Sequence, residues 1–117
     1  MTIENLQQIV KSFCETRDWD QFHSPKDLAI GISTEANELL DLFRFKTDTQ
    51  MKFMMESEKS REMISEEIAD VFFFMLRFSE MYGFDLDKAL IDKMDKNNKK
   101  YPVEIAKGNN LKYTEFE

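Results

Sequence analysis

The chain has 117 residues, of which 42% are hydrophobic, and a formal net charge of −7 at pH 7. This length is that of one ordinary domain, and the negative charge argues against nucleic-acid binding, which needs a basic surface. No apolar run reaches the roughly 18 residues of a membrane span, and the opening residues MTIENLQQIV lack the features of a signal peptide. We therefore expect one cytoplasmic domain over residues 1–117 that binds neither nucleic acid nor membrane.

The chain has few helix-breaking residues, with three glycines and two prolines. This composition predicts an all-α fold with no convincing strand. Apolar spacing and capping signals place four main helices at about residues 2–17, 25–45, 61–82 and 86–100. The polar connector before the third helix has room for a short helical turn, and residues 103–117 form a partly ordered tail. The single cysteine, Cys14, is expected to be a buried apolar residue.

The second helix carries a carboxylate inside its apolar stripe. With each residue advancing about 100° around the helix, Glu35 falls among the apolar positions of the stripe, and Glu38 lies on its flank one turn along. Charged residues are rarely buried unless they are paired. Glu35 is therefore a candidate for a site.

The third helix repeats this pattern and is apolar almost all round. Glu67 lies at the edge of its apolar stripe, and Asp70 lies further round, beside Phe74. Such a helix needs more cover than one small domain supplies, so we expect a homo-oligomer, either a dimer or a tetramer, whose four-helix bundles are completed by association.

The two helices thus supply two carboxylate pairs, Glu35-x-x-Glu38 and Glu67-x-x-Asp70. Spacing of i, i+3 places both members of a pair on one helix face. If the two helices are antiparallel neighbours, four carboxylates meet, and they cannot all stay ionised without cations. Oxygen ligands suit Mg²⁺, with Mn²⁺ as a substitute. Either pair taken alone is more often a solvated surface feature than a functional one.

The fourth helix begins an apolar stripe that polar residues continue. Lys93, Asn97 and Lys100 take positions on the same face as the earlier leucines. Positive donors on an inward face suit a polyanion, whereas a lysine-rich helix end can also simply emerge into water, favoured by the helix dipole. Both interpretations stay open on spacing alone.

These features together resemble the MazG-like all-α nucleoside triphosphate pyrophosphatase superfamily, and within it the dCTP pyrophosphatase branch. The matching segments are DWDQFHSPKDLA, STEANELLDLFRF, EEIADV and DLDKALIDKMDKNNKKYP. The ordered set ExxE, ExxD and KxxxNxxKYP is a specific signature, whereas ExxE alone is weak. The resemblance covers nearly the whole chain.

The resemblance implies a Mg²⁺-dependent enzyme that cleaves a nucleoside triphosphate, dCTP or a related pyrimidine substrate, to monophosphate and pyrophosphate. It implies that the four carboxylates hold the metal and that Glu35 or Glu38 acts as general base. It also implies contacts from the fourth helix and the residue after it to the phosphates or sugar, through Lys93, Asn97, Lys100 and Tyr101.

The base pocket is implied by the same resemblance. Trp19 and His23 match an aromatic stretch that precedes the second helix, and a ring there could stack on a pyrimidine. Phe45 stands where the branch has a Trp and Phe74 where it has a Tyr, so both offer a ring without a polar group.

Three other interpretations of the sequence compete with this one. A di-iron carboxylate bundle requires Glu-x-x-His motifs in pairs, and this chain has one histidine, outside the expected helices. A noncatalytic helical oligomerisation module would explain the apolar third helix but not the embedded Glu35. A MazG-like enzyme of broad or different nucleotide specificity remains an alternative.

Overall fold

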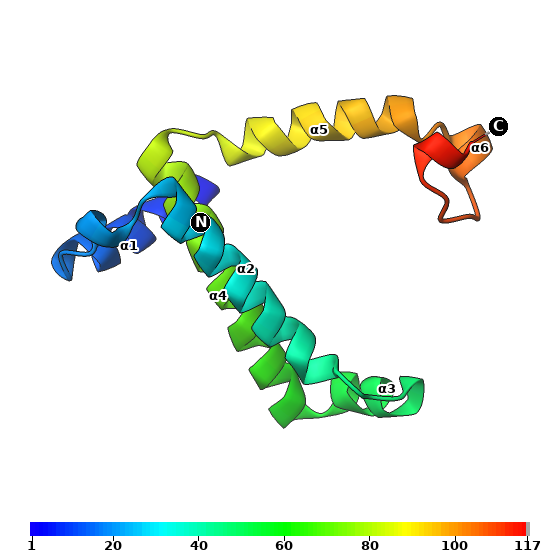
Figure 1. Ribbon diagram of the computed structural model, residues 1–117, viewed down its shortest axis with the longest axis horizontal. Helices are drawn as coiled ribbons and strands as arrows, with labels where there is room; N and C mark the ends of the chain where they lie inside the picture. Colours follow the sequence, from blue (N-terminus) through cyan, green and yellow to red (C-terminus); the bar gives the residue numbers. More distant parts are fainter. Residues whose placement is uncertain (117) are drawn as a thin grey trace. The chain divides into compact units, whose positions relative to one another are not determined.

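The computed structural model describes residues 1–116, whose regular elements are all helices, with no strand among them (Figure 1). The elements in chain order are α1 (Ile3–Thr16), the 3-10 turn η1 (Asp20–Phe22), α2 (Pro25–Phe43), α3 (Asp48–Glu56), α4 (Glu58–Tyr82), α5 (Leu86–Lys100), α6 (Val103–Ala106) and the 3-10 turn η2 (Tyr113–Glu115). The predicted all-α class is confirmed. No helix in the described residues is both long and apolar enough to cross a membrane.

Side-chain caps explain where the helices begin. The Ser24 hydroxyl accepts from the backbone of Asp27 ahead of Pro25, as the sequence indicated. The predicted start of α4 was three residues late, because Ser57 caps the helix. The connector before α4 also holds more structure than expected. Thr47 opens the nine-residue α3 with a reciprocal capping box.

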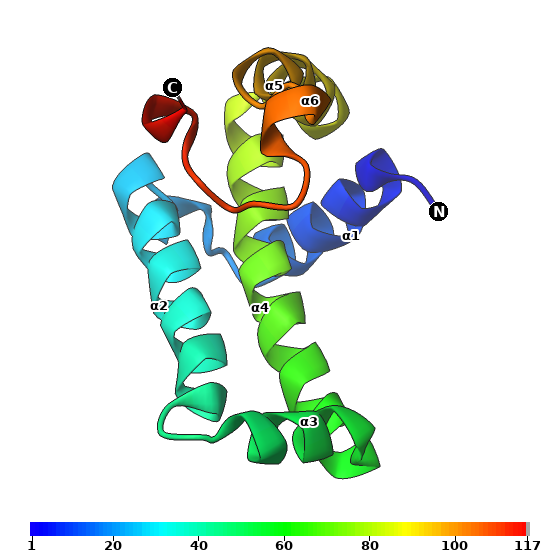
Figure 2. The same ribbon diagram turned by 90° about the vertical axis from the view of Figure 1, so that its right-hand side faces the viewer.

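Two compact units make up the chain, Met1–Gly83 and the segment from Phe84 onward. In the first unit, α2 and α4 run side by side in opposite directions, α3 lies across one end of the pair, and α1 packs against α4 (Figures 1 and 2). Gly83 ends α4 with a φ of 75°, a left-handed C-cap that glycine adopts at low cost.

The buried core of the first unit is small. The buried apolar side chains of the described residues are those of Val10, Cys14, Leu28, Ile64 and Leu76, and Cys14 is fully buried, as its sequence context indicated. The apolar surface predicted all round α4 is only partly covered within one chain, since Ile68 is 53% exposed and Met75 42%. The oligomer that would cover it stays a prediction.

The second unit is built on α5. The Tyr101 ring packs edge-on against those of Tyr113 and Phe116, and the Lys100 ammonium lies 4.8 Å from the Tyr113 ring centre. These contacts hold Tyr113 and Phe116 against the C-terminal end of α5. The segment that was expected to be partly ordered contains α6 and η2. That residues 1–117 form a single domain stays a prediction.

Candidate active site

The carboxylate pairs of α2 and α4 come together. Glu35 and Glu38 project from α2 and Glu67 and Asp70 from α4, and one carboxylate oxygen of each lies within 4.8 Å of those of the others. The i, i+3 spacing within each helix and the antiparallel course of the two helices produce this meeting. It is the arrangement on which the metal-site hypothesis depended.

The packing of α2 on α4 is especially close one turn away from these pairs. Gly31 lies one turn before Glu35, and Phe74 lies one turn after Asp70. A Cβ atom on Gly31 would lie 2.6 Å from carbon atoms of the Phe74 ring. The ring therefore rests directly on the glycine, and the absence of a side chain at position 31 permits this contact.

The site is electrostatically strained without a cation. A hydrogen bond with Glu38, burial and repulsion from Glu38, Asp70 and Glu67 together raise the pKa of Glu35 to about 7. Burial and the charge of Glu38, with which it also shares a hydrogen bond, raise the pKa of Glu67 in the same way. The acids thus resist being ionised together.

These residues fit a hard divalent cation. The Oε2 atoms of Glu35 and Glu67 are buried and have no hydrogen-bond partner among the described residues. Buried carboxylate oxygens normally have a partner, and oxygen-only donor sets suit Mg²⁺ or Mn²⁺. Glu38 and Asp70 are exposed, which leaves the cluster accessible to a cation and a substrate from solution.

A chain of ring contacts runs from the segment before α2 to the edge of this cluster. The Trp19 ring contacts those of His23 and Phe13, and Phe13 contacts Phe73, which contacts Phe74. Every contact is edge-to-face, with ring centres 5.2 to 6.2 Å apart, an arrangement that aromatic pairs favour. The structure therefore connects three of the predicted base-pocket residues, Trp19, His23 and Phe74, through two intervening phenylalanines.

The fourth predicted base-pocket residue lies elsewhere in the unit. Phe45 follows the end of α2, is 88% exposed and has a φ of 63°, unusual for a residue with a side chain. The Arg44 guanidinium lies 4.7 Å from its ring centre. Among residues 1–116, no ring contact joins Phe45 to Trp19 or His23.

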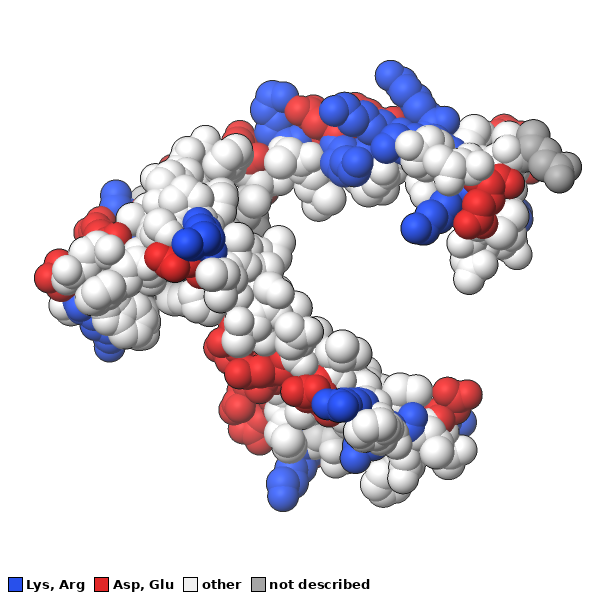
Figure 3. Space-filling view, in the orientation of Figure 1, with Lys and Arg blue, Asp and Glu red and all other residues white. Residues whose placement is uncertain are grey.

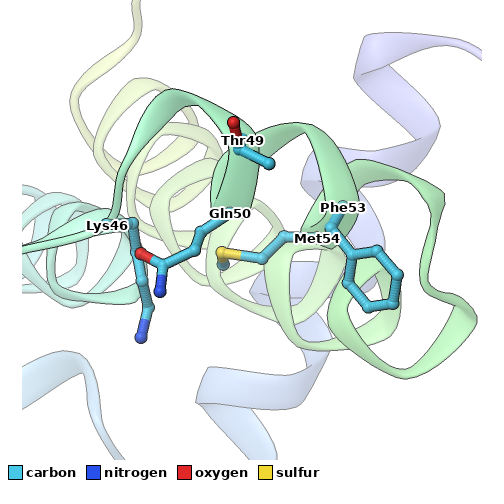
Figure 4. Close-up of a pocket in the computed structure, with 5 residues that line it drawn as sticks. All are labelled: Lys46, Thr49, Gln50, Phe53 and Met54. Carbon is cyan, nitrogen blue, oxygen red and sulfur yellow. The ribbon is translucent and has the colours of Figure 1, made fainter.

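Two pockets lie next to Phe45, around Lys46. One, of about 470 Å³, is lined mainly by α3 residues (Figure 4): Lys46, Thr49, Gln50, Phe53 and Met54. The other, of about 360 Å³, includes Asp41 and Met63. Because Asp41 is one turn from Glu38 and Met63 one turn from Glu67, this second pocket lies next to the carboxylate cluster.

The predicted phosphate-binding residues belong to the second unit. Lys93, Asn97 and Lys100 lie on α5, and Tyr101 is its C-cap. Figure 3 shows lysine side chains along α5, and acidic side chains gathered over the paired helices of the first unit. Lys100 and Tyr101 also contact the aromatic residues of the chain end.

One charged residue was missed by sequence reasoning. Arg77 is 1% exposed, inside the apolar part of α4, and binds Asp20, His23 and Glu80. A single arginine between Leu76 and Phe78 was a visible signal, but its partners at positions 20 and 23 are more than 50 residues away.

Comparison with known proteins places the chain. A model of the MazG-like family matches residues 30–116. The chain belongs to the MazG-like family. This MazG-like protein is 35% identical to dCTP pyrophosphatase 1 of Mus musculus over 115 residues, which are 98% of this chain and 68% of the mouse protein. Its identity to dCTP pyrophosphatase 1 of Homo sapiens is 34%, with the same coverage.

A solved structure agrees. The crystal structure of a pyrophosphatase from Archaeoglobus fulgidus superposes with a TM-score of 0.77 at 35% identity, covering 85% of this chain and 91% of the other. The predicted enzyme class is therefore confirmed. This MazG-like protein is a nucleoside triphosphate pyrophosphatase, a hydrolase acting on acid anhydrides.

Proposed function

We propose that this MazG-like protein uses Mg²⁺ to cleave a pyrimidine deoxynucleoside triphosphate, dCTP or a close relative of it, to the monophosphate and pyrophosphate. The observation that carries the proposal is the cluster of four carboxylates with two buried oxygen atoms that have no hydrogen-bond partner. The naming of the mammalian relatives as dCTP pyrophosphatases supports the choice of substrate.

The metal is assigned to Glu35, Glu38, Glu67 and Asp70. When bound there, Mg²⁺ would neutralise charge on the triphosphate and lower the pKa of an attacking water. A cation held there would also relieve the repulsion that raises the pKa of Glu35 and Glu67.

The chain's own groups take the remaining roles. Glu35 or Glu38 accepts the proton of the attacking water, since both lie at the cluster and no protein nucleophile is required. The cations Lys93 and Lys100, with Asn97 and Tyr101, are assigned to the phosphates or sugar. Their assignment rests on the family pattern.

The aromatic side chains are assigned to binding the nucleobase of the substrate. Trp19, His23 and Phe74 belong to one connected set of rings, and Trp19 is 37% exposed, so a face or edge is open to stacking. Phe45 is assigned to the base by resemblance. Its ring, at the end of α2, is exposed and therefore open to contact with a base.

One observation favours an alternative, a broader specificity for the nucleobase. Phe74, which ends the aromatic chain one turn from Asp70, has no polar atom with which to read the edge of a base. A site that recognises bases by stacking alone discriminates weakly among them. A MazG-like pyrophosphatase of broad nucleotide specificity is therefore the alternative.

We also propose that the working form is a homo-oligomer, a dimer or a tetramer. The large apolar residues exposed on α4, among them Ile68 and Met75, support it. Sedimentation of the purified protein at micromolar concentration measures this directly, and a monomer would contradict it.

A panel of nucleoside triphosphates with Mg²⁺ tests the function. Pyrophosphate and inorganic phosphate are measured separately for each of the deoxy and ribo substrates. We expect pyrophosphate and monophosphate in equal amounts, with dCTP among the best substrates. Release of single phosphate with a diphosphate left behind would contradict the mechanism, and equal rates for all bases would favour the broad-specificity alternative.

A further inference from the structure

Resting on the proposed role of His23 and Trp19 at the base, we propose that Arg77 is a positioning residue that holds His23 as a hydrogen-bond donor to the substrate. Arg77 touches no part of the carboxylate cluster among the described residues. Its action on the reaction would pass through the turn that carries Trp19 and His23.

The guanidinium of Arg77 is shared among three partners. Its Nε donates to Nδ1 of His23 at 2.9 Å, one terminal nitrogen donates to Glu80 Oε2 at 2.8 Å, and the other donates to Asp20. Arginine presents five N–H donors in a fixed planar fork. The fork therefore sets the position of the histidine ring relative to α4 and to the turn at Asp20.

The first of these bonds determines which nitrogen of His23 carries the proton. Arginine has donors and no acceptor, so Nδ1 of His23 must accept and cannot itself be protonated. The imidazole is then neutral with its hydrogen on Nε2. No described residue accepts a hydrogen bond from Nε2, so this N–H is available to a ligand.

The electrostatic surroundings agree with a neutral ring. Burial and the charge of Arg77 lower the pKa of His23, opposed by the carboxylates of Asp20, Asp27 and Glu80. Adding a proton at Nδ1 would place two N–H groups against each other and break the bond to Arg77. His23 therefore stays neutral at a pH where a free imidazole begins to protonate.

The backbone of the same turn is held as well. The Tyr82 hydroxyl donates to the His23 carbonyl oxygen at 2.6 Å, and the Trp19 N–H donates to the Cys14 carbonyl at 3.0 Å. The Asp20 side chain is also bound to Arg77, so two α4 side chains, Arg77 and Tyr82, hold this turn by hydrogen bonds. These bonds fix the position of the His23 ring relative to the Trp19 ring, whose centre is 6.2 Å away.

This arrangement limits what His23 can recognise. An N–H donor pairs with an acceptor, such as the carbonyl oxygen that cytosine, uracil and thymine share, and it rejects an exocyclic amino group. Ring nitrogens and carbonyl oxygens of purines are acceptors as well, so His23 should bind any base that presents an acceptor to it, without distinguishing cytosine from uracil.

Nuclear magnetic resonance tests the bond in the unaltered protein, because His23 is its single histidine. Long-range ¹H–¹⁵N spectra should show Nε2 protonated and Nδ1 unprotonated, with a titration midpoint below that of free imidazole. A proton on Nδ1, or a titration like that of a free imidazole, would overturn the proposal. This arm needs neither activity nor a variant.

A double-mutant cycle tests the positioning role. Arg77→Lys keeps the charge and loses the fork, and we expect it to raise KM for the best substrate about tenfold, the equivalent of one hydrogen bond, with kcat little changed. In a His23→Ala background Arg77→Lys should raise KM no further. Arg61→Lys, on the same helix but bound to the Met55 carbonyl, is the matched control and should leave KM unchanged.

The outcomes separate the two proposals. Additive effects of Arg77→Lys and His23→Ala on KM mean that Arg77 does not act through His23, and the inference fails while the proposed function stands. A wild-type protein that cleaves no nucleoside triphosphate overturns the function and, with it, the role in recognition. If Arg77→Lys does not fold, Asp20→Asn, at a half-exposed partner of the same fork, replaces it in the cycle.

Discussion

The ring of Phe74 lies on Gly31 so closely that a Cβ atom there would be 2.6 Å from two of its carbon atoms. Gly31 is thus the place where α2 makes room for an α4 side chain, one turn from Glu35 and one turn from Asp70. The same ring ends the aromatic chain from His23 and Trp19. A methyl group added at position 31 would therefore disturb both the packing of α2 on α4 and the proposed base pocket.

We predict that Gly31→Ala displaces the Phe74 ring. The helix propensity gained, up to about 1 kcal/mol, opposes an overpacking cost of about 1–3 kcal/mol. The net result should be a Tm lower by a few degrees and a KM raised severalfold. Phe74→Leu in the same chain should recover the Tm, measured by circular dichroism, because the smaller side chain frees the space. An unchanged KM for Gly31→Ala would remove Phe74 from the substrate site.

Substitution of a clustered carboxylate should lower the catalytic rate without disturbing the fold. Glu38→Gln or Asp70→Asn is expected to lower kcat by more than about a hundredfold, since even groups that only orient metal ligands cost 10–100-fold when removed. Helix content should not change, and the metal-free variants should unfold at a higher temperature, because one negative charge is gone. Glu62→Gln, an exposed acid of α4 outside the cluster, is the control. Turnover retained in either variant removes that residue from the site.

The metal-free protein should lose stability as pH rises. The pKa of Glu35 is about 7 in the folded chain against 4.5 for the free side chain, so the folded state binds more protons than the unfolded state between these values. The free energy of unfolding then falls with rising pH across this window, and Glu67 acts in the same direction. Urea unfolding at pH 5, 6, 7 and 8 with a chelator measures it. Glu35→Gln should flatten the slope, and a stability that rises across the window would contradict the assignment.

Mg²⁺ should reverse this loss. A ligand that binds only the folded state adds about 2.7 kcal/mol at a hundred times its Kd, so millimolar Mg²⁺ should raise the Tm of the wild type at pH 7.5. Mn²⁺ should do the same, and a monovalent salt at equal ionic strength should not. No shift with either metal, in the presence or absence of nucleotide, would argue against a metal site at these four acids.

Much of the fold was predictable because its signals are local. The Ser24-Pro25 cap, the Gly83 stop and the span of α5 all follow from neighbouring residues. So does the pairing of acids within each helix, where i, i+3 spacing is enough. That the two pairs meet needed only the assumption that α2 and α4 are antiparallel neighbours, which the structure bears out.

What escaped prediction depends on contacts between distant residues or on competing caps. The capping box of Thr47 and Gln50 creates α3 in a segment whose apolar spacing is irregular. Phe45 adopts a positive φ after the end of α2. Glycine usually marks such a conformation in a sequence, and none stands near this position. The sequence near Arg77 does not tell whether its side chain is buried or exposed. Its partner Asp20 is 57 residues away, so the ion pair leaves no local signal.

The buried fork of Arg77 has a consequence for how related sequences can vary. The Glu80 side chain is 9% exposed and faces the guanidinium, so loss of the arginine would leave a buried anion alone, at a high cost in free energy. Positions 77 and 80 should therefore be inherited together: lineages that replace the arginine with an apolar residue should also have given up the acid, while His23 gains freedom to change tautomer.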